Sequence, residues 1–303
     1  MTPPGFLGIG WTGWSRLTPA APRRTSAAMT RIALYQARTG IDPAANASDL
    51  VAAFGEAAAG GAAMLFTPEM SGLLDRDRER AAARLRKPEE DPVLAAVREA
   101  AAREKIWVHL GSLAMVGPAG KLRNRAFVID DQGEIRATYD KLHLFDVDLP
   151  SGESWRESAA YEAGDGAVVV DTPAGPIGLS ICYDLRFAGL YTALTDAGAE
   201  LLAIPAAFTV PTGEAHWHVL MRARAIEAGV FVIAAAQCGH HEDGRYTYGH
   251  SLVVGPWGEV LLDMGGANNG IGFAEIDLGD VAAVRARVPA IRHRRIIPPI
   301  IRA

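Results

Sequence analysis

The stretch Gly178-Leu-Ser-Ile-Cys182-Tyr-Asp-Leu-Arg-Phe187 offers a thiol at the corner between a strand and a helix. Pro176 to Ile181 is an apolar run long enough only for a buried strand, and an alanine- and leucine-rich helical pattern follows Arg186. At a helix N-terminus the free N–H groups and the partial positive charge lower the pKa of a cysteine and can hold an oxyanion. Cys182 is therefore a candidate nucleophile. The alternative is a small buried side chain, which is the common state of a free cysteine.

Length and composition indicate one large α/β domain or two small ones in a chain of 303 residues. The net charge of -5 and the pI near 5.9 provide no basic field, so nucleic acid is a poor candidate partner and a small molecule is favoured. The two cysteines, Cys182 and Cys238, are too few for a disulfide framework and indicate a reducing, cytoplasmic location. No apolar run reaches the roughly 18 to 20 residues of a membrane helix, so we expect no membrane partner.

Residues 1–28 differ in composition from the rest of the chain. They are rich in Gly, Pro, Ala and Thr, carry three arginines and contain no acidic residue. Three interpretations stay open: an organellar transit peptide, a disordered tail, or an extension upstream of a start at Met29. We expect residues 1–29 to be a disordered extension, residues 30–288 to form the domain, and residues 289–303 to form a C-terminal tail.

Hydrophobic patterning in the first half alternates between strands and helices. The predicted elements are a strand, a helix, a strand that ends near Glu69, a helix and a strand, at 31–38, 46–59, 62–70, 92–104 and 106–112. This β-α-β-α-β rhythm implies a layered sheet with helices outside. A hairpin of 123–130 with 134–139, turning at Asp131-Gln-Gly133, then inserts antiparallel pairing.

The second half of the chain has a similar rhythm. Its predicted elements are a hairpin, a strand, a helix, a strand, a second hairpin, a last strand and a short helix, at 167–171 with 175–181, 200–205, 213–228, 229–236, 248–254 with 259–263, 270–276 and 278–287. The fold that satisfies both halves is an α/β protein with a four-layer α-β-β-α sandwich, two mixed sheets with helices on both outer faces. The apolar stretch Ile296–Ile301 would be poorly placed alone in water and predicts a subunit contact.

Four residues capable of chemistry lie at predicted strand ends or in the loops beside them: Glu69, Lys141, Glu157 and Cys182. Lys141 is one of only four lysines against twenty-six arginines, which suggests a position where a guanidinium cannot serve. A compact ammonium can stabilise an oxyanion and lower a thiol pKa, and a carboxylate beside the thiol can take its proton. Together these groups predict a nucleophile that needs no histidine.

Three strings, in this order, resemble the signatures of the nitrilase, or carbon–nitrogen hydrolase, superfamily: Phe66-Thr-Pro-Glu69, Tyr139-Asp-Lys-Leu-His-Leu-Phe-Asp146 and Gly178–Phe187. The resemblance runs from about residue 31 to residue 288. Further strings look most like the deaminated glutathione amidase branch: Arg156-Glu157-Ser158, Ala234-Ala-Ala-Gln-Cys-Gly-His-His-Glu242, Tyr248-Gly-His-Ser251 and Gly255-Pro-Trp-Gly-Glu259. The resemblance implies a nitrilase-type sandwich over residues 30–288 and a homodimer or higher homo-oligomer to which the tail contributes.

This resemblance also assigns roles to residues. It implies that Glu69, Lys141 and Cys182 form a catalytic triad and that Glu157 is a second catalytic glutamate. The implied function is hydrolysis of a small, deaminated-glutathione-like carboxamide to a carboxylate and ammonia through a Cys182 thioester, with no cofactor. Alternatives are an omega-amidase acting on 2-oxoglutaramate and a nitrilase. A catalytically silent scaffold is disfavoured because all three triad positions are intact.

Three residues are candidates for binding the substrate. We expect the backbone N–H of Tyr183 to hold the oxyanion together with the ammonium of Lys141. Arg186 is a candidate for gripping a substrate carboxylate, with bracing of Asp184 as its alternative role, and Phe208 is a further candidate contact. The sequence departs from its relatives at His218, where they commonly have glutamate, and at Gly189, where a proline-glutamate pair is usual.

Metal binding and thiol redox chemistry are two alternative functions for the cysteines and histidines of this chain. Cys238, His240, His241 and His250 match no common structural zinc spacing, and neighbouring His240 and His241 would point apart on a strand. His216 and His218 would lie roughly 200° apart on a helix. We therefore expect no metal. Redox chemistry at Cys182 lacks a resolving cysteine nearby in the sequence.

Overall fold

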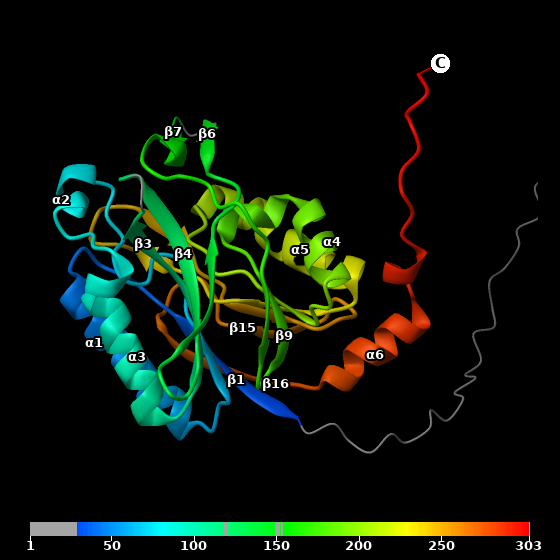
Figure 1. The fold of residues 1–303 in the computed structure, drawn as a ribbon, viewed down its shortest axis with the longest axis horizontal. Helices are drawn as coiled ribbons and strands as arrows, with labels where there is room; N and C mark the ends of the chain where they lie inside the picture. The colour runs from blue at the N-terminus through cyan, green and yellow to red at the C-terminus, as the bar shows by residue number, and fades with distance from the viewer. Residues whose placement is uncertain (1–28, 118–119, 149–151, 153, 303) are drawn as a thin grey trace, which may run out of the picture.

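The computed structural model describes residues 29–117, 120–148, 152 and 154–302, and within them two six-stranded mixed sheets face each other (Figure 1). The first sheet has the order β16-β1-β2-β3-β4-β5 and the second the order β15-β14-β11-β10-β9-β8. The strands of the first sheet are β1 (Thr30–Gln36), β2 (Met64–Phe66), β3 (Trp107–Val116), β4 (Leu122–Ile129), β5 (Ile135–Asp140) and β16 (Gly270–Ile276). Those of the second are β8 (Val169–Thr172), β9 (Gly175–Leu179), β10 (Leu201–Ala203), β11 (Phe231–Ala234), β14 (Leu252–Val254) and β15 (Val260–Asp263).

Helices cover the outer faces of both sheets. In Figure 1, α1 (Pro43–Ala59) and α3 (Pro92–Glu104) lie on one side of the sandwich, and α4 (Ala188–Asp196) and α5 (Val210–Ala228) lie on the other. The remaining helices are α2 (Arg78–Ala82), α6 (Leu278–Arg287) and the short 3₁₀ turns η1 (Pro88–Glu90), η2 (Glu157–Ala159), η3 (Cys182–Arg186) and η4 (Ile291–His293). The α-β-β-α fold class predicted from the sequence is confirmed. No helix in the described ranges is both long enough and apolar enough to cross a bilayer.

Strand alternation explains why a sheet can be covered on both faces. In β1, Ile32 and Leu34 belong to the core between the sheets, where Ile177 of β9 also lies. Ala33, between them, belongs instead to the core under α1 and α3, where Phe54 also lies. Successive side chains of a strand point to opposite faces, so a strand buried on both faces is apolar throughout.

Parallel pairing brings the ends of several strands to one region. β1, β2 and β3 are parallel neighbours in the first sheet, and β9, β10 and β11 are parallel neighbours in the second. The carboxyl ends of parallel neighbours meet at one edge of a sheet, where open α/β sheets place their chemistry. Glu69 follows β2 and Cys182 follows β9, so each sheet contributes one of them.

Two sequence-based expectations about local structure were wrong. Tyr248 does not pair with the strand that ends at Asp263. It is the last residue of β13 (Tyr246–Tyr248), which forms a separate hairpin with β12 (Cys238–His240). Gly249 and His250 have φ of 71° and 55°, so the extended conformation is interrupted between β13 and β14. Between the predicted hairpins at 123–139 and 167–181, where we predicted no strand, β6 (Asp146–Asp148) and β7 (Ser154–Arg156) form a small hairpin before η2.

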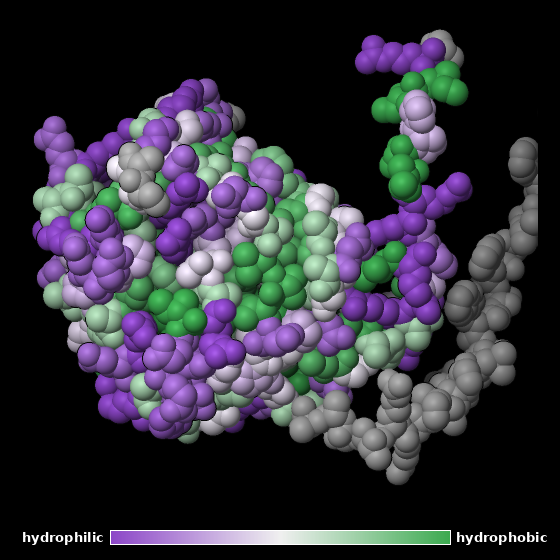
Figure 2. Space-filling view, viewed as in Figure 1, coloured by the Kyte–Doolittle hydropathy of each residue, from purple (hydrophilic) through white to green (hydrophobic). Residues whose placement is uncertain are grey.

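The structure describes the C-terminal tail up to residue 302 and begins at Met29 on the N-terminal side. The N-terminal extension expected over residues 1–29 lies outside the described residues except for Met29. Beyond α6 the chain leaves the body of the molecule, and its apolar side chains stand out in Figure 2. Ile296 is 97% exposed and Ile301 is 91% exposed, which is unfavourable for large aliphatic side chains in water.

Candidate active site

Cys182 occupies a strained corner that its neighbours hold in place. It begins η3 after the extended residue Ile181, shortly beyond the end of β9, and its φ of 49° is in the left-handed region, which costs a non-glycine residue about 1 kcal/mol or more. Its N–H donates to Pro205 O at 2.9 Å. The buried carboxylate of Asp184 accepts from the N–H of Ile181 at 2.9 Å and from the Tyr139 hydroxyl at 2.7 Å, which fixes the turn. The thiol is therefore presented in one orientation.

Glu69 links the two sheets at this corner. Its Oε1 accepts from Lys141 Nζ at 2.8 Å and from Asn124 Nδ2 at 2.9 Å, both from the first sheet or its edge. Its Oε2 accepts from the N–H of Ala207 at 3.0 Å, beyond the end of β10 in the second sheet. The Cys182 thiol lies beside this carboxylate, and each of the two groups shifts the pKa of the other. A carboxylate so placed can receive the thiol proton without moving.

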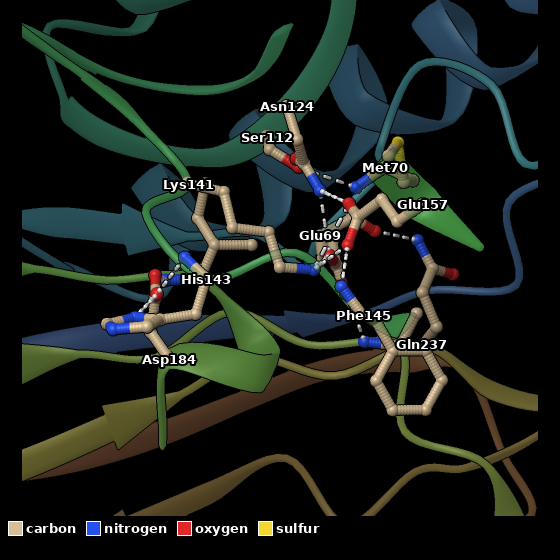
Figure 3. Close-up of polar contacts among 12 residues, drawn as sticks. Glu69, Met70, Ser112, Asn124, Lys141, His143, Phe145, Glu157, Asp184 and Gln237 are labelled. Carbon is tan, nitrogen blue, oxygen red and sulfur yellow. Dashed lines mark hydrogen bonds and ion pairs between the residues drawn. The ribbon is translucent and has the colours of Figure 1, made fainter. Parts of the chain in front are cut away.

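Lys141 is held between two carboxylates directly after β5. Its Nζ lies 2.8 Å from Glu69 Oε1 and 3.1 Å from Glu157 Oε2, and the side chain is buried. Glu157 Oε2 accepts from the N–H of Phe145 at 2.7 Å, so this second glutamate is itself fixed to the loop after Lys141. Figure 3 shows Lys141, Glu69 and Glu157 converging, with Asn124 above them.

The charges of the cluster set its resting protonation. Burial alone would lower the pKa of Lys141, but the charges of Glu157 and Glu69 raise it well above its ordinary value. Burial would raise the pKa of Glu69, but the Lys141 charge and the hydrogen bonds to the carboxylate hold the pKa below its ordinary value. Burial, and then the charge of Glu69, raise the pKa of the Cys182 thiol well above its ordinary value, although Lys141 acts in the opposite direction.

This result corrects the expectation that the turn and the lysine would depress the thiol pKa. At neutral pH the resting site holds a Cys182 thiol, a Glu69 carboxylate and a Lys141 ammonium. The thiol loses its proton only as it attacks, and Glu69 is the adjacent acceptor for that proton. Activation by a neighbouring base thus replaces activation by a low resting pKa.

All seven residues predicted for the site line one cavity of about 1090 Å³. They are Glu69, Lys141, Glu157, Cys182, Tyr183, Arg186 and Phe208. The cavity walls are aromatic around the thiol: the Tyr183 ring meets Phe145 edge-on, with centroids 5.1 Å apart, and Arg186 lies 5.5 Å from the Phe208 centroid. A volume of this size accommodates a substrate of several hundred daltons.

Arg186 is oriented by these rings and by a histidine. Its guanidinium carbon lies 5.8 Å from the Tyr183 ring centroid, and its Nη1 lies 3.3 Å from His216 Nδ1. The alternative role of bracing Asp184 is not what the structure shows: the oxygens of Asp184 accept from His143, Tyr139 and the backbone. Among the described residues Arg186 has no carboxylate within ion-pairing distance, so its charge is available to the cavity.

The sequence analysis missed three groups that orient the cluster. Asn124 Nδ2 donates to both Glu69 Oε1 and Glu157 Oε1, at 2.9 and 3.1 Å. Gln237 Nε2 donates to the backbone carbonyl of Glu69 at 2.9 Å, and the N–H of Ala207 holds the other carboxylate oxygen. One signal was available: Asn124 shares a strand face with Ala126 and Val128, so an amide stands in line with buried apolar side chains.

The residues weighed for a zinc site do not assemble into the group considered. His240 is exposed and stacks on Tyr246, with ring centroids 4.4 Å apart. His241 is buried, and its ring nitrogens contact Thr39 O at 3.0 Å and Thr247 Oγ1 at 2.7 Å. The two histidines thus point apart, as their positions on a strand predict.

Comparison with known proteins identifies the relatives of this fold and site. The Carbon-nitrogen hydrolase family matches residues 31–286. A deaminated glutathione amidase of Bos taurus is 38% identical over 285 residues, which span 92% of this chain and 86% of that protein. The crystal structure of the C. elegans NitFhit protein matches with a TM-score of 0.82 and 37% identity, covering 89% of this chain and 66% of that chain.

A further solved structure bears on the cysteine. It is a variant of the amidase from Nesterenkonia sp. AN1, with a TM-score of 0.74 and 27% identity, covering 93% of this chain and 97% of that one. In it the acetamide moiety of fluoroacetamide is covalently added at the active site cysteine. With a match over residues 31–286 and close similarity to proteins named amidases, this chain belongs to the carbon–nitrogen hydrolase family of the nitrilase superfamily and hydrolyses carbon–nitrogen bonds other than peptide bonds.

Proposed function

We propose that the chain is a thiol-dependent amidase that hydrolyses a small, deaminated-glutathione-like carboxamide to a carboxylate and ammonia. The observation that carries this proposal is the placement of one buried carboxylate, Glu69, beside the Cys182 thiol and in a hydrogen bond with the Lys141 ammonium, at the wall of a single cavity. Such a cluster supplies a nucleophile, a base and a cation for an oxyanion, which are the three requirements of acyl transfer.

Acylation would begin when Glu69 takes the thiol proton. The Cys182 sulfur attacks the carboxamide carbon, and the electron pair of the C=O bond moves to oxygen. The Lys141 ammonium and the Tyr183 N–H hold this oxyanion, since donors aimed at developing charge stabilise it most in a dry site. When the carbonyl reforms, the C–N bond breaks, Glu69 returns its proton to the departing nitrogen, and ammonia leaves. The product is a thioester on Cys182.

Deacylation repeats these steps with water. Glu69, again a carboxylate, takes a proton from a water molecule that attacks the thioester carbon. The tetrahedral intermediate collapses, the C–S bond breaks, and the proton on Glu69 returns to the Cys182 sulfur. Glu157 keeps the Lys141 ammonium in place through both steps, which is why we assign it an orienting role and no covalent one.

Recognition of the acyl group would rest on Arg186. Its guanidinium lines the cavity without a carboxylate partner among the described residues, and it lies against the rings of Tyr183 and Phe208. A guanidinium binds a carboxylate through two parallel hydrogen bonds, so a substrate that carries a carboxylate remote from its carboxamide fits this wall. Proteins named deaminated glutathione amidase are among the relatives, which supports a substrate of that class.

A substrate panel tests this proposal. Ammonia release would be measured with deaminated glutathione, 2-oxoglutaramate, simple amides and nitriles, with the Cys182→Ala protein as the blank. We expect the highest kcat/KM for deaminated glutathione and no release by the variant. Preference for 2-oxoglutaramate would indicate an omega-amidase, and preference for nitriles would indicate a nitrilase. Absence of release from every member of the panel would overturn the amidase assignment.

We propose that the protein works as a homodimer in the cytoplasm. Ile296, Ile297, Ile300 and Ile301 are all at least 80% exposed, and a second copy of the chain is the partner that would bury them. Both cysteines are free, which suits a reducing compartment. Light scattering should give twice the chain mass for the full chain and a smaller mass after truncation beyond Val288. A monomeric full chain would contradict the dimer.

A further inference from the structure

We propose that His218, His250 and Asp263 form a zinc-binding site on the outer side of the second sheet. One nitrogen from each imidazole and one carboxylate oxygen lie within 4.8 Å of one another. None of the three residues lines the catalytic cavity. The proposal is therefore independent of the amidase function.

Three separate elements bring these side chains together. His218 lies on α5, His250 precedes β14, and Asp263 ends β15. His218 Nε2 lies 2.9 Å from Asp263 Oδ2, and His250 Nδ1 lies 2.9 Å from Asp263 Oδ1. Both rings thus turn a nitrogen towards the same carboxylate, so that three possible ligand atoms lie near one another.

The backbone holds the site in this form. His250 has a φ of 55°, and its N–H donates to Gly265 O at 2.8 Å. Gly265 N donates in turn to Asp263 Oδ1 at 2.9 Å. The Tyr248 ring stacks on the His250 ring, with centroids 4.4 Å apart and planes 24° apart. A left-handed histidine fixed by a ring stack and a backbone bond has little freedom to lose when a cation binds.

The donor set suits zinc. Two imidazole nitrogens and one carboxylate oxygen are ligands of borderline softness, and three protein ligands with an open fourth position are typical of zinc sites that keep a water molecule. Zinc-to-nitrogen and zinc-to-oxygen bonds of about 2.0 to 2.2 Å place tetrahedral ligand atoms roughly 3.3 to 3.6 Å apart. The two hydrogen-bonded distances of 2.9 Å therefore need to widen by about 0.4 to 0.7 Å, within a group whose ligand atoms all lie within 4.8 Å of one another.

Solvent can supply the remaining ligand. The side chains of His218, His250 and Asp263 are 33%, 25% and 31% exposed. On binding, each neutral imidazole would keep its single proton on the nitrogen that faces away from the metal, so no oxidant or further reactant is needed. The cation would then tie α5 to β15, and α5 begins directly after Thr209 at the cavity wall.

A binding titration on chelator-treated, tag-free protein tests the site. The Cys182→Ala protein is the parent, because it removes the catalytic thiol as a competing zinc ligand. Isothermal titration with zinc chloride at pH 7 should give one zinc ion per chain. His218→Ala and Asp263→Ala in this parent should each weaken binding by at least about tenfold, since even partners that only orient a ligand cost 10- to 100-fold. His250→Asn, which tolerates the left-handed backbone, should do the same.

His240→Ala is the matched control, because His240 is an exposed histidine that also stacks on a tyrosine. It should bind zinc as the parent does. Thermal melts without zinc establish that each variant folds, and zinc should raise the melting temperature of the parent and of His240→Ala but not of His218→Ala. The proposal is overturned if the parent binds no stoichiometric zinc, or if His218→Ala and His240→Ala bind it equally well.

Discussion

The two cysteines of this chain share an environment in one respect and differ in another. Both are buried, and burial raises the pKa of both thiols above their ordinary values. Cys238 begins β12 and has the guanidinium of Arg38 beside it. The charge of Arg38 acts to lower the pKa of the Cys238 thiol, but a guanidinium cannot accept the thiol proton. Cys182 has the Glu69 carboxylate and the catalytic cavity beside it.

The difference shows what makes a thiol a nucleophile in this protein. A raised resting pKa is common to both sites, so it cannot distinguish them. A base in contact with the thiol, a cation for the oxyanion and an open cavity occur together only at Cys182 of the two cysteines. Substitutions at and around the two thiols should therefore differ widely in their effect on turnover.

Removing the sulfur of Cys182 should abolish turnover. Cys182→Ala and Cys182→Ser are expected to lower kcat by about four to six orders of magnitude, because residues of one catalytic unit fail together. Ammonia release at saturating substrate measures the loss, and a thermal melt shows that the fold is kept. If Cys182→Ala retained appreciable turnover while Cys238→Ala lost it, the roles of the two thiols would be reversed.

Lys141→Arg keeps the charge but should not keep the activity. The ammonium fits between Glu69 and Glu157 at 2.8 and 3.1 Å, and a planar guanidinium spreads its charge over a larger area than this space allows. Turnover should fall by at least about 10² to 10³, the usual cost of one oxyanion donor. Lys87→Arg, at an exposed position, is the control and should be active. Retention of more than about a tenth of turnover by Lys141→Arg would show that charge alone suffices.

Glu157→Gln should weaken catalysis without disabling the thiol. The amide cannot pair with the Lys141 ammonium, although Phe145 N–H can still donate to its oxygen. We expect turnover to fall by less than the factor of about 10² to 10⁴ that a general base contributes. Stoichiometric alkylation of Cys182 by iodoacetamide should continue. Loss of alkylation together with turnover would indicate that Glu157, and not Glu69, is the base.

Cys238→Ala should have the smallest effect on activity. Its side chain packs in the interior away from the catalytic cavity, so most of the turnover should remain. The lost sulfur should lower the free energy of unfolding by about 1 kcal/mol, as expected for a small buried deletion. Urea titration measures the stability and ammonia release the activity. Activity that fell in step with that of Cys182→Ala would remove the contrast between the two cysteines.

Sequence reasoning located the reactive residues because their positions follow from strand ends. Glu69 and Cys182 each follow an apolar strand, and the carboxyl ends of parallel neighbours form the edge of a sheet where chemistry is placed. The meeting of the two residues then comes from the packing of one sheet on the other. The four-layer fold followed from two halves with the same alternation of strands and helices. Both inferences depend on the local periodicity of apolar residues, which can be read directly from the sequence.

Features that depend on long-range pairing were beyond the same reasoning. β1 pairs with β16 across more than two hundred residues, and no periodicity marks that partner. Asn124 joins the catalytic cluster only because β4 lies beside β5, so that its amide reaches Glu69 and Glu157. His218 and His250 meet at Asp263 for a similar reason, because α5 packs against β14, which pairs with β15. Spacing along the chain correctly kept His240 and His241 apart but could not reveal this convergence.

The covalent intermediate would show which thiol is the nucleophile. Wild-type protein mixed with substrate, quenched in acid within the first turnovers and digested, would be analysed by mass spectrometry for an acyl group on each cysteine-containing peptide. The account predicts an adduct with the mass of the acyl group on the peptide that contains Cys182, and none on the peptide that contains Cys238. An acyl group on Cys238, or turnover with no thioester on Cys182 under conditions that trap thioesters, would contradict it.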